Sequence, residues 1–153
     1  MDILIRNAEP TDWAAIAEFN RALAAETEDK ELDWDTVAAG VRKVLGDMGK
    51  GRYFIAESGG RIVGMTMITY EWSDWRDGWI WWIQSVYVQP DFRGAGVFAR
   101  LYRHIRAQAA ESGVRAVRLY VLESNTRARA IYARLGMRES GYRVLESGDS
   151  QPE

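Results

Sequence analysis

The chain has 153 residues, of which 47% are hydrophobic and 27% are charged, and its formal net charge is −2. That length fits one domain with a buried core, and the composition excludes a globally disordered chain. The absence of cysteine excludes disulfides, thiolate metal ligands and a cysteine nucleophile. A single histidine, His104, argues against a histidine-rich metal site or a serine–histidine dyad, so we expect no metal.

The chain shows no signal for export or membrane insertion. Residues 1–6 do not combine a basic leader with an apolar segment, and no run reaches the ~18 consecutive apolar residues of a membrane span. We therefore expect a cytoplasmic protein with no membrane partner. A sequence pI near 5.6 also argues against a nucleic-acid partner.

The small net charge conceals a division along the chain. Residues 1–92 carry 9 basic and 16 acidic side chains, whereas residues 93–143 carry 11 arginines and only 3 glutamates. This asymmetry favours an anionic ligand beside the second half and a cationic ligand beside the first. Arginines on solvated helix faces are the alternative explanation.

Hydrophobic periodicity and turn residues predict the elements. In order, these are a strand at 3–6, helices starting near Thr11 and at about 34–48, strands at 52–57, 61–70 and 79–88, a helix at 94–111, a strand at 114–122, a helix at about 125–135 and a last strand at 137–145. Thr11 is the expected N-cap of the first helix. The order β-α-α-β-β-β-α-β-α-β predicts one mixed α+β domain over residues 1–146, followed by a flexible tail at 147–153.

A glycine turn after Pro90 is the most informative segment. The strand ending at Val88 leads through Arg93, Gly94 and Gly96 into a helix. A helix start offers unpaired amides and the positive end of the helix dipole, and glycines allow a phosphate to approach the backbone. The segment therefore predicts a phosphate-binding turn.

Two common phosphate motifs do not explain this turn. A P-loop requires Gly-Lys-Ser/Thr, but Val97 follows Gly96. The dinucleotide pattern fits Gly94, Gly96 and Ala99, with Glu123 as the ribose acid. However, four residues separate the strand from Gly94, and only about thirty residues follow Glu123, too few for the rest of a Rossmann sheet. We exclude both motifs.

Two other motifs carry a resemblance. The pattern Arg/Gln-x-x-Gly-x-Gly/Ala is matched by Arg93, Gly96 and Phe98, with Phe98 larger than the residue expected there. The pattern Asn-x-x-Ala-x-x-x-Tyr-x-x-x-Gly-Phe/Met is matched in register by Asn125, Ala128, Tyr132, Gly136 and Met137. In both motifs and their order, the chain resembles the GCN5-related N-acetyltransferase (GNAT) superfamily. The resemblance covers nearly the whole chain and is most specific from about residue 79 to residue 145.

The resemblance implies a fold and a co-substrate. The fold is a single α+β domain with a central mixed, mostly antiparallel sheet and helices on both faces. The co-substrate is acetyl-CoA, which lies where two parallel strands splay, here the strands ending near Val88 and Leu122. The implied contacts come from the strand, the glycine turn and the following helix, namely Val86, Tyr87, Val88, Arg93, Gly94, Ala95, Gly96, Val97, Phe98, Asn125, Ala128 and Tyr132.

The resemblance also implies direct attack of a neutral amine on the thioester in a ternary complex. Tyr132 would protonate the departing thiolate, because a phenol with a pKa of about 10 can donate to a thiolate of pKa about 8 to 9. The absence of cysteine disfavours an acetyl-cysteine intermediate. Packing of Tyr132 on the core or on the coenzyme, without proton transfer, is the alternative.

Acidic and aromatic side chains predict an amine pocket. Six carboxylates lie between residues 26 and 35, and five of the seven tryptophans fall between residues 72 and 82. Carboxylates beside aromatic rings suit an ammonium group, and burial raises the pKa of a carboxyl so that it can act as a base. We predict Glu26 and Glu28 as acceptor ligands and bases, with Trp72 and Trp82 as walls. A homodimer interface is the alternative role of the tryptophans.

The sequence therefore predicts an N-acetyltransferase that moves an acetyl group from acetyl-CoA to the primary amine of a small molecule. Polyamine-like, amino-acid-like and aminoglycoside-like acceptors all fit this prediction. Two alternatives remain. One is a non-catalytic CoA-binding sensor or interaction module, and the other is an acetyltransferase that acts on a protein amine.

Overall fold

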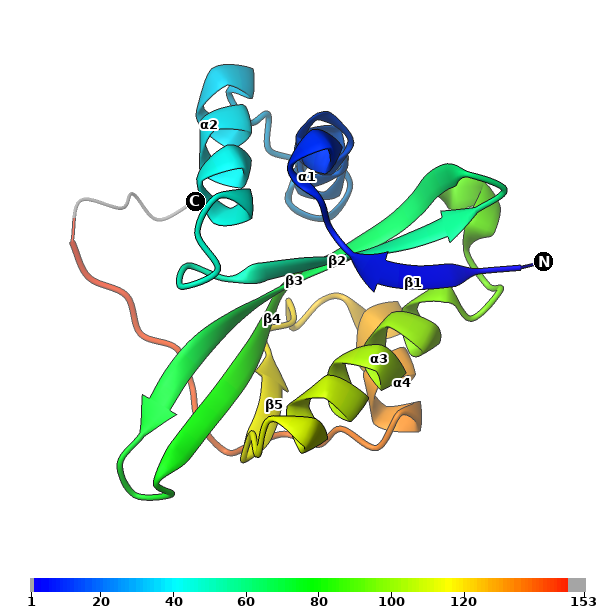
Figure 1. Cartoon of the computed structure of the whole chain (residues 1–153). Helices are drawn as coiled ribbons and strands as arrows, with labels where there is room; N and C mark the ends of the chain where they lie inside the picture. The colour runs from blue at the N-terminus through cyan, green and yellow to red at the C-terminus, as the bar shows by residue number, and fades with distance from the viewer. Residues whose placement is uncertain (1, 149–153) are drawn as a thin grey trace. The chain divides into compact units, whose positions relative to one another are not determined.

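A five-stranded mixed sheet forms the centre of the computed structural model, which describes residues 2–148 (Figure 1). Its strands lie in chain order, namely β1 (Leu4–Asn7), β2 (Arg52–Ser58), β3 (Arg61–Ser73), β4 (Gly78–Val88) and β5 (Ala116–Leu119). Every neighbouring pair is antiparallel except β4 and β5, which are parallel. This arrangement confirms the predicted mixed, mostly antiparallel α+β fold.

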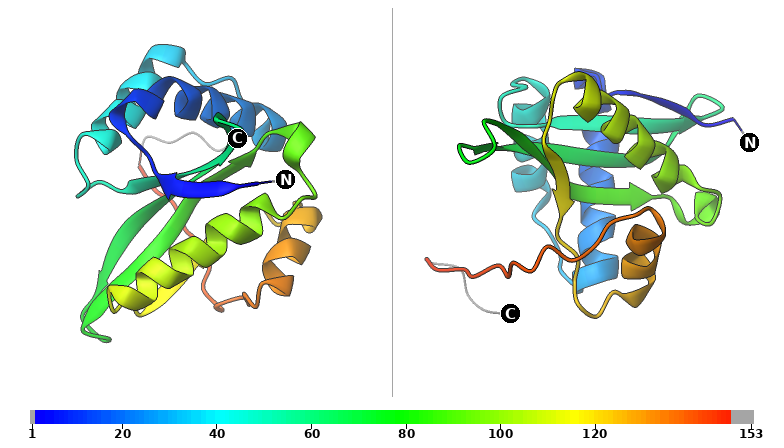
Figure 2. Two further views of the ribbon diagram at one scale, coloured as in Figure 1. Left: turned by 45° about the vertical axis from the view of Figure 1, so that its right-hand side comes forward. Right: turned by 90° about the horizontal axis from the view of Figure 1, so that it is seen from below.

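Helices cover both faces of this sheet (Figure 2). On one face lie α1 (Trp13–Glu28) and α2 (Trp34–Leu45). The core of this face contains Ile16, Ala17 and Phe19 of α1, Val41 of α2, and Tyr53, Ile55, Met65 and Tyr87 of the sheet. On the other face lies α3 (Val97–Glu111), where the ring centroids of His104 and Phe54 are 5.3 Å apart. Successive strand residues alternate between faces, so the side chains of Phe54 and its neighbours pack into two separate apolar layers, one on each face of the sheet.

The chain divides into two compact units, Met1–Tyr120 and Val121–Glu153. The first contains the whole sheet and α1 to α3. The described part of the second contains α4 (Thr126–Arg134), where the side chain of Asn125 accepts a hydrogen bond from the Ala128 amide at 3.1 Å. This helix agrees with the one predicted at about 125–135, for which Ser124 or Asn125 is the expected cap.

The start of the first helix differs from its prediction. Pro10–Asp12 form a 3₁₀ turn and α1 begins at Trp13, so Thr11 is not an N-cap. Asp12, which is only 8% exposed, instead accepts two hydrogen bonds from Arg6 at 2.8 and 3.0 Å and one from the Glu9 amide at 2.6 Å. The carboxylate of Asp12 thus fixes the conformation of the chain where α1 begins, because a buried carboxylate requires several hydrogen-bond donors.

The prediction of a last strand at residues 137–145 is wrong. Residues 137–148 contain neither helix nor strand, and the predicted strand at 114–122 is reduced to Ala116–Leu119. A strand needs a neighbour for its backbone and an apolar face to bury, but Tyr142, Val144 and Leu145 are all exposed. The polar run Arg138–Ser140 also interrupts the alternation. Residues 149–153 of the predicted tail lie outside the described residues.

Candidate functional site

The glycine turn forms at the end of β4, as the sequence predicts. Pro90–Phe92 make a 3₁₀ turn, and α3 begins at Val97. Gly94 and Gly96 have φ values of 80° and 79°, in the left-handed region that side chains with a Cβ rarely adopt. Two such glycines around Ala95 turn the chain sharply into the helix.

This turn has the properties of an anion site. A Cβ at Gly94 or Gly96 would meet no heavy atom within 4 Å, so the backbone there faces open space. Gly96 caps α3 without a side-chain hydrogen bond, and its carbonyl accepts from the Arg100 amide at 3.1 Å. The first amides of a helix have no intrahelical acceptor, and the helix dipole adds positive charge. A phosphate group therefore fits this turn.

The edge of β4 beside the turn has a stretch without a partner strand. Pairing with β5 ends at Ile83, opposite Leu119, whereas β4 continues to Val88. Met67 pairs with Ser85 and Ile68 with Ile83, so the intervening Gln84 forms a β-bulge, which bends a strand. Among the described strands, none pairs with this edge from Gln84 to Val88. The five residues span about 16 Å at about 3.3 Å each, enough to pair with an extended polar chain.

A hydrogen-bonded cluster joins this turn to α1. Arg93 donates from Nε to the Val88 carbonyl at 2.8 Å and from Nη2 to Glu26 at 2.7 Å. The Tyr87 hydroxyl donates to the other oxygen of Glu26 at 3.3 Å, and the guanidinium carbon of Arg93 lies 5.3 Å from the centre of the Tyr87 ring. Burial, followed by the charge of Glu26, raises the pKa of Tyr87, which keeps this phenol protonated.

The structure does not bring the four predicted acceptor residues together. Glu26 contacts Tyr87 and Arg93, and Glu28 lies 3.5 Å from Lys30. Trp72 pairs across the ribbon with Trp79, eight positions from Tyr87 along β4, or about 26 Å at about 3.3 Å per residue. Trp72 therefore cannot line one small pocket with Glu26.

The fourth predicted acceptor residue, Trp82, belongs to a different cluster. Its indole Nε1 donates to Glu71 at 2.9 Å, and its ring stacks on Tyr120 with centroids 4.5 Å apart and planes 21° from parallel. Arg118 completes the cluster, with a guanidinium nitrogen 3.9 Å from Glu71. Glu71, Arg118 and Tyr120 are not among the site residues that the sequence predicts. Only the strand register, which places Arg118 opposite Trp82, reveals them.

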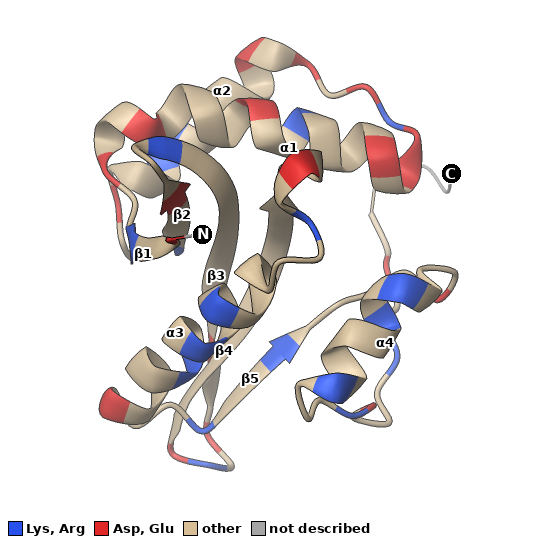
Figure 3. Cartoon of the chain, turned by 90° about the vertical axis from the view of Figure 1, so that its right-hand side faces the viewer, with Lys and Arg blue, Asp and Glu red and all other residues tan. Residues whose placement is uncertain are grey.

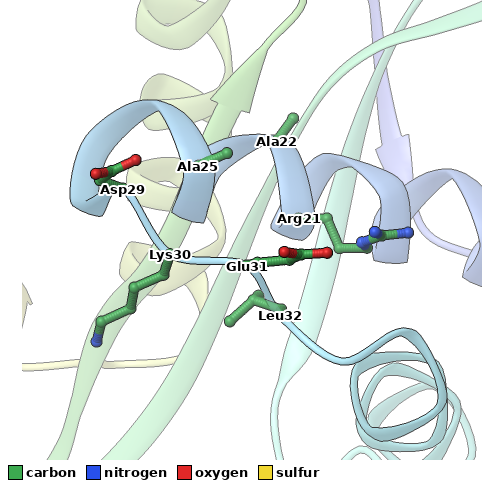
Figure 4. A pocket seen from close by; sticks show the side chains of 7 residues that line it. All are labelled: Arg21, Ala22, Ala25, Asp29, Lys30, Glu31 and Leu32. Atoms are coloured by element: carbon green, nitrogen blue, oxygen red, sulfur yellow. The ribbon is translucent and has the colours of Figure 1, made fainter.

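A pocket of about 520 Å³ lies by the end of α1 and its connection to α2 (Figure 4). Its lining mixes small apolar and charged side chains, namely Arg21, Ala22, Ala25, Asp29, Lys30, Glu31 and Leu32. Glu26 and Glu28 are not among them, so this pocket is not the predicted amine pocket.

Tyr132 lies on α4, in the second unit, where its carbonyl accepts from the Met137 amide at 3.0 Å. Burial raises the pKa of the Tyr132 phenol above its ordinary value. The hydroxyl therefore carries its proton at neutral pH.

The described residues, 2–148, contain neither a metal-binding cluster nor a membrane-spanning helix. In that range, no three His, Asp or Glu side chains are grouped so as to hold a metal ion. Nor does any helix in that range have the length and apolar character that crossing a membrane requires.

Comparison with known proteins identifies the family of this chain. The acetyltransferase (GNAT) family model matches residues 11–137. The chain belongs to this family. Within the GNAT family, it is 28% identical over 149 residues to the thialysine N-epsilon-acetyltransferase of Sus scrofa, an alignment that covers 90% of this chain and 85% of that enzyme. Identity to the Bos taurus enzyme of the same name is 30% over 78 residues, and this chain spans less than half of that relative, 45%.

Solved structures share the GNAT fold over nearly the full chain. A possible acetyltransferase from Clostridium difficile 630 is 41% identical, with a TM-score of 0.91 and coverage of 97% of this chain and 99% of that one. An aminoglycoside N-acetyltransferase solved in complex with CoA is 18% identical, with a TM-score of 0.81 and coverage of 97% and 96%. At that identity the second likeness demonstrates the fold alone.

Proposed function

We propose that this protein transfers the acetyl group of acetyl-CoA to the primary amine of a small molecule by direct attack in a ternary complex. The observation that carries the proposal is the combination of the Arg93–Val97 turn with the unpaired β4 edge. The turn suits a pyrophosphate, and the edge suits an amide-containing arm that pairs as an added strand. CoA has both groups.

The residues assigned to the co-substrate keep the roles that the family motifs imply. Val86, Tyr87 and Val88 would flank the pantetheine arm, and the amides from Arg93 to Phe98 would hold the pyrophosphate. Asn125, Ala128 and Tyr132 would contribute from α4. When bound, acetyl-CoA supplies an acetyl group that its thioester activates toward a nucleophilic amine.

The side chains of the protein must transfer two protons during the reaction. One leaves the ammonium form of the acceptor, and the other is delivered to the departing thiolate. We assign the second to Tyr132, whose raised pKa keeps the phenol protonated. For the first, we favour Glu28 over Glu26, because both oxygens of Glu26 already accept hydrogen bonds from Tyr87 and Arg93. Glu26 would then hold the turn in place.

One relative supports an amine acceptor of small size. It is named a thialysine N-epsilon-acetyltransferase, and thialysine is a small molecule. A cytoplasmic location and a homodimer stay predictions from the sequence.

The decisive experiment measures release of free thiol from acetyl-CoA across a panel of amines. Since the chain has no cysteine, a thiol reagent detects only the product. We expect release that depends on an amine, and a fall in kcat of about 100-fold or more in Tyr132→Phe, with unchanged CoA affinity. Tyr142→Phe, in the exposed segment after α4, is the matched control.

Other outcomes discriminate between the alternatives. CoA binding without release for any small amine, but with release for peptides, would indicate a protein acceptor. Binding with no release for either class would indicate a non-catalytic CoA-binding module. A protein that does not bind CoA would refute the proposal.

A further inference from the structure

The cluster of Glu71, Arg118, Tyr120 and Trp82 occupies a special place in the first unit. Arg118 pairs with Trp82, and the next pair, Ile83 with Leu119, is the last between β4 and β5. Tyr120 follows directly, and the Gln84 bulge begins on the other strand. The cluster therefore lies where the two strands part, at the end of the unpaired edge that is farther from the glycine turn.

The cluster and the α1–α2 core share one face of the sheet. Met65 and Met67 pack in the core beneath α1 and α2. Side chains along a strand alternate, so Thr69 and Glu71 follow on the same face. Trp82 lies opposite Thr69 and its indole reaches Glu71. Among Thr69, Glu71 and Trp82, none belongs to the helix-covered core, and the Glu71 side chain is 44% exposed.

Glu71 is a fixed carboxylate with capacity for another donor. The Trp82 indole holds one of its oxygens at 2.9 Å, and the nearest Arg118 nitrogen stands 3.9 Å from the other, longer than a hydrogen bond. An ionised carboxylate can accept about four hydrogen bonds. An ammonium group can therefore bind beside Trp82 without displacing a close partner.

The rings and Arg118 complete a dipolar surface. Tyr120 stacks on Trp82 and is still 53% exposed, so it offers aromatic surface to a ligand. The guanidinium carbon of Arg118 lies 5.8 Å from the centre of the Trp82 ring. A fixed positive charge here repels an acceptor with ammonium groups alone, whereas an acceptor that also carries a carboxylate satisfies both charges.

We infer that this cluster is the acceptor-binding site and that it selects an amino-acid-like acceptor, with Glu71 taking an ammonium group and Arg118 a carboxylate. Trp82 positions Glu71, and Tyr120 provides an aromatic surface beside the ligand. This inference rests on the proposed acetyltransferase function and narrows its substrate class.

Matched amines test the inference. L-lysine and L-ornithine are compared with cadaverine and putrescine, which are the same molecules without the carboxylate. We expect wild-type kcat/KM to favour each amino acid over its diamine by about tenfold or more. Arg118→Met should abolish that preference, because it removes the partner of the amino acid's carboxylate and also the charge that repels the diamines, so kcat/KM falls for the amino acids and rises for the diamines. Glu71→Gln should raise the KM of every amine by about tenfold, with unchanged affinity for CoA.

Controls keep the result specific. Glu18→Gln alters an exposed carboxylate on α1 and should change no amine's KM. Thermal melting establishes that each variant is folded. Trp82→Phe removes the indole donor to Glu71 and keeps an aromatic ring at this position, so it should reproduce part of the Glu71→Gln effect. Calorimetric titration of L-lysine into the CoA-saturated protein measures binding without turnover.

Failure of this inference differs from failure of the proposed function. If amines drive thiol release but the diamines are preferred, or Glu71→Gln leaves every KM unchanged, the acetyltransferase stands and the acceptor site is refuted. If no amine drives thiol release, the proposed function fails, but the titration of L-lysine still tests whether the cluster binds an amino acid. Absence of measurable L-lysine binding then overturns it.

Discussion

Asp12 shows how one buried carboxylate fixes a local structure. It joins β1 to the start of α1 through Arg6, and the hydrogen bonds from Arg6 and the Glu9 amide hold the pKa of Asp12 below its usual range. The folded-state pKa lies below the unfolded value of about 3.9, so the pair stabilises the fold above that pH. The contribution is lost as the pH falls through the folded-state pKa.

We therefore expect Asp12→Asn to lower the free energy of unfolding by about 1–3 kcal/mol at pH 7. The difference from wild type should shrink below about pH 4, where Asp12 of the unfolded wild-type chain begins to take up a proton. Urea unfolding at a series of pH values measures this. Asp74→Asn, at an exposed position in the β3–β4 loop, is the control. A difference that stays constant down to pH 2.5 would contradict the assignment.

At the scale of elements, a substitution in the glycine turn should weaken CoA binding strongly and lower folding stability only modestly. Gly96→Ala places a side chain at φ 79°, which costs about 1–2 kcal/mol, and projects a methyl group into the open space before the amides. We expect at least about tenfold weaker CoA binding with a modest loss of thermal stability.

Gly113→Ala gives the matched comparison for the turn. Gly113 follows the other end of α3, has a φ of 69° and likewise has no heavy atom within 4 Å of an added Cβ. The two variants should lose similar stability, and only Gly96→Ala should lose CoA affinity in a direct titration. Equal affinities would indicate that the phosphates bind elsewhere.

The contact between α1 and the turn depends on the shape of one side chain. Arg93 reaches the Val88 carbonyl and Glu26 at once, from two different nitrogens. A lysine has a single ammonium group and cannot span both acceptors. We expect Arg93→Lys to raise the KM of acetyl-CoA several-fold, with the KM of the amine unchanged.

A double-mutant cycle identifies the route of this effect. If Glu26 acts by holding Arg93, then Glu26→Gln and the double variant should both resemble Arg93→Lys, a non-additive result. Fully additive effects would mean that the two side chains act independently. A loss of kcat in Glu26→Gln alone would instead restore Glu26 as the base.

At the scale of the whole molecule, charge is divided by sequence and by element. Acidic residues mark α1 and its connection to α2, whereas basic residues mark α3 and β5 (Figure 3). Considered separately, α4 carries Arg127, Arg129 and Arg134. CoA is strongly anionic, so the basic segments should accelerate its capture.

We expect kcat/KM for acetyl-CoA to fall several-fold between about 20 and 300 mM salt, while kcat changes little, because the Debye length falls from about 20 Å to about 6 Å over this range. Acetyl-pantetheine, which has no phosphate groups, serves as the control in the same steady-state assay. If its kcat/KM falls equally, salt acts on the protein or the amine rather than on capture of the phosphates.

The sequence alone determined the features that depend on neighbouring residues. Alternation and periodicity predicted the sheet and its helices, because burial of one face imposes a period of two or 3.6 residues. The glycine turn could also be predicted from neighbouring residues, since Gly94, Gly96 and the following helix are adjacent in the chain. The helix at about 125–135 was predicted for the same reason, and of its two expected caps, Ser124 and Asn125, it is Asn125 that accepts from the Ala128 amide.

Only the tertiary structure decided which distant side chains meet. Glu26 met Arg93 rather than Trp72, because α1 packs against the end of β4. Glu71 met Trp82 and Arg118, because strand register brings together residues up to 47 positions apart. The last predicted strand was absent because pairing requires a partner that a local pattern does not reveal. The contacts of the phosphate turn follow from chain order, whereas the acceptor cluster exists only after the sheet has formed.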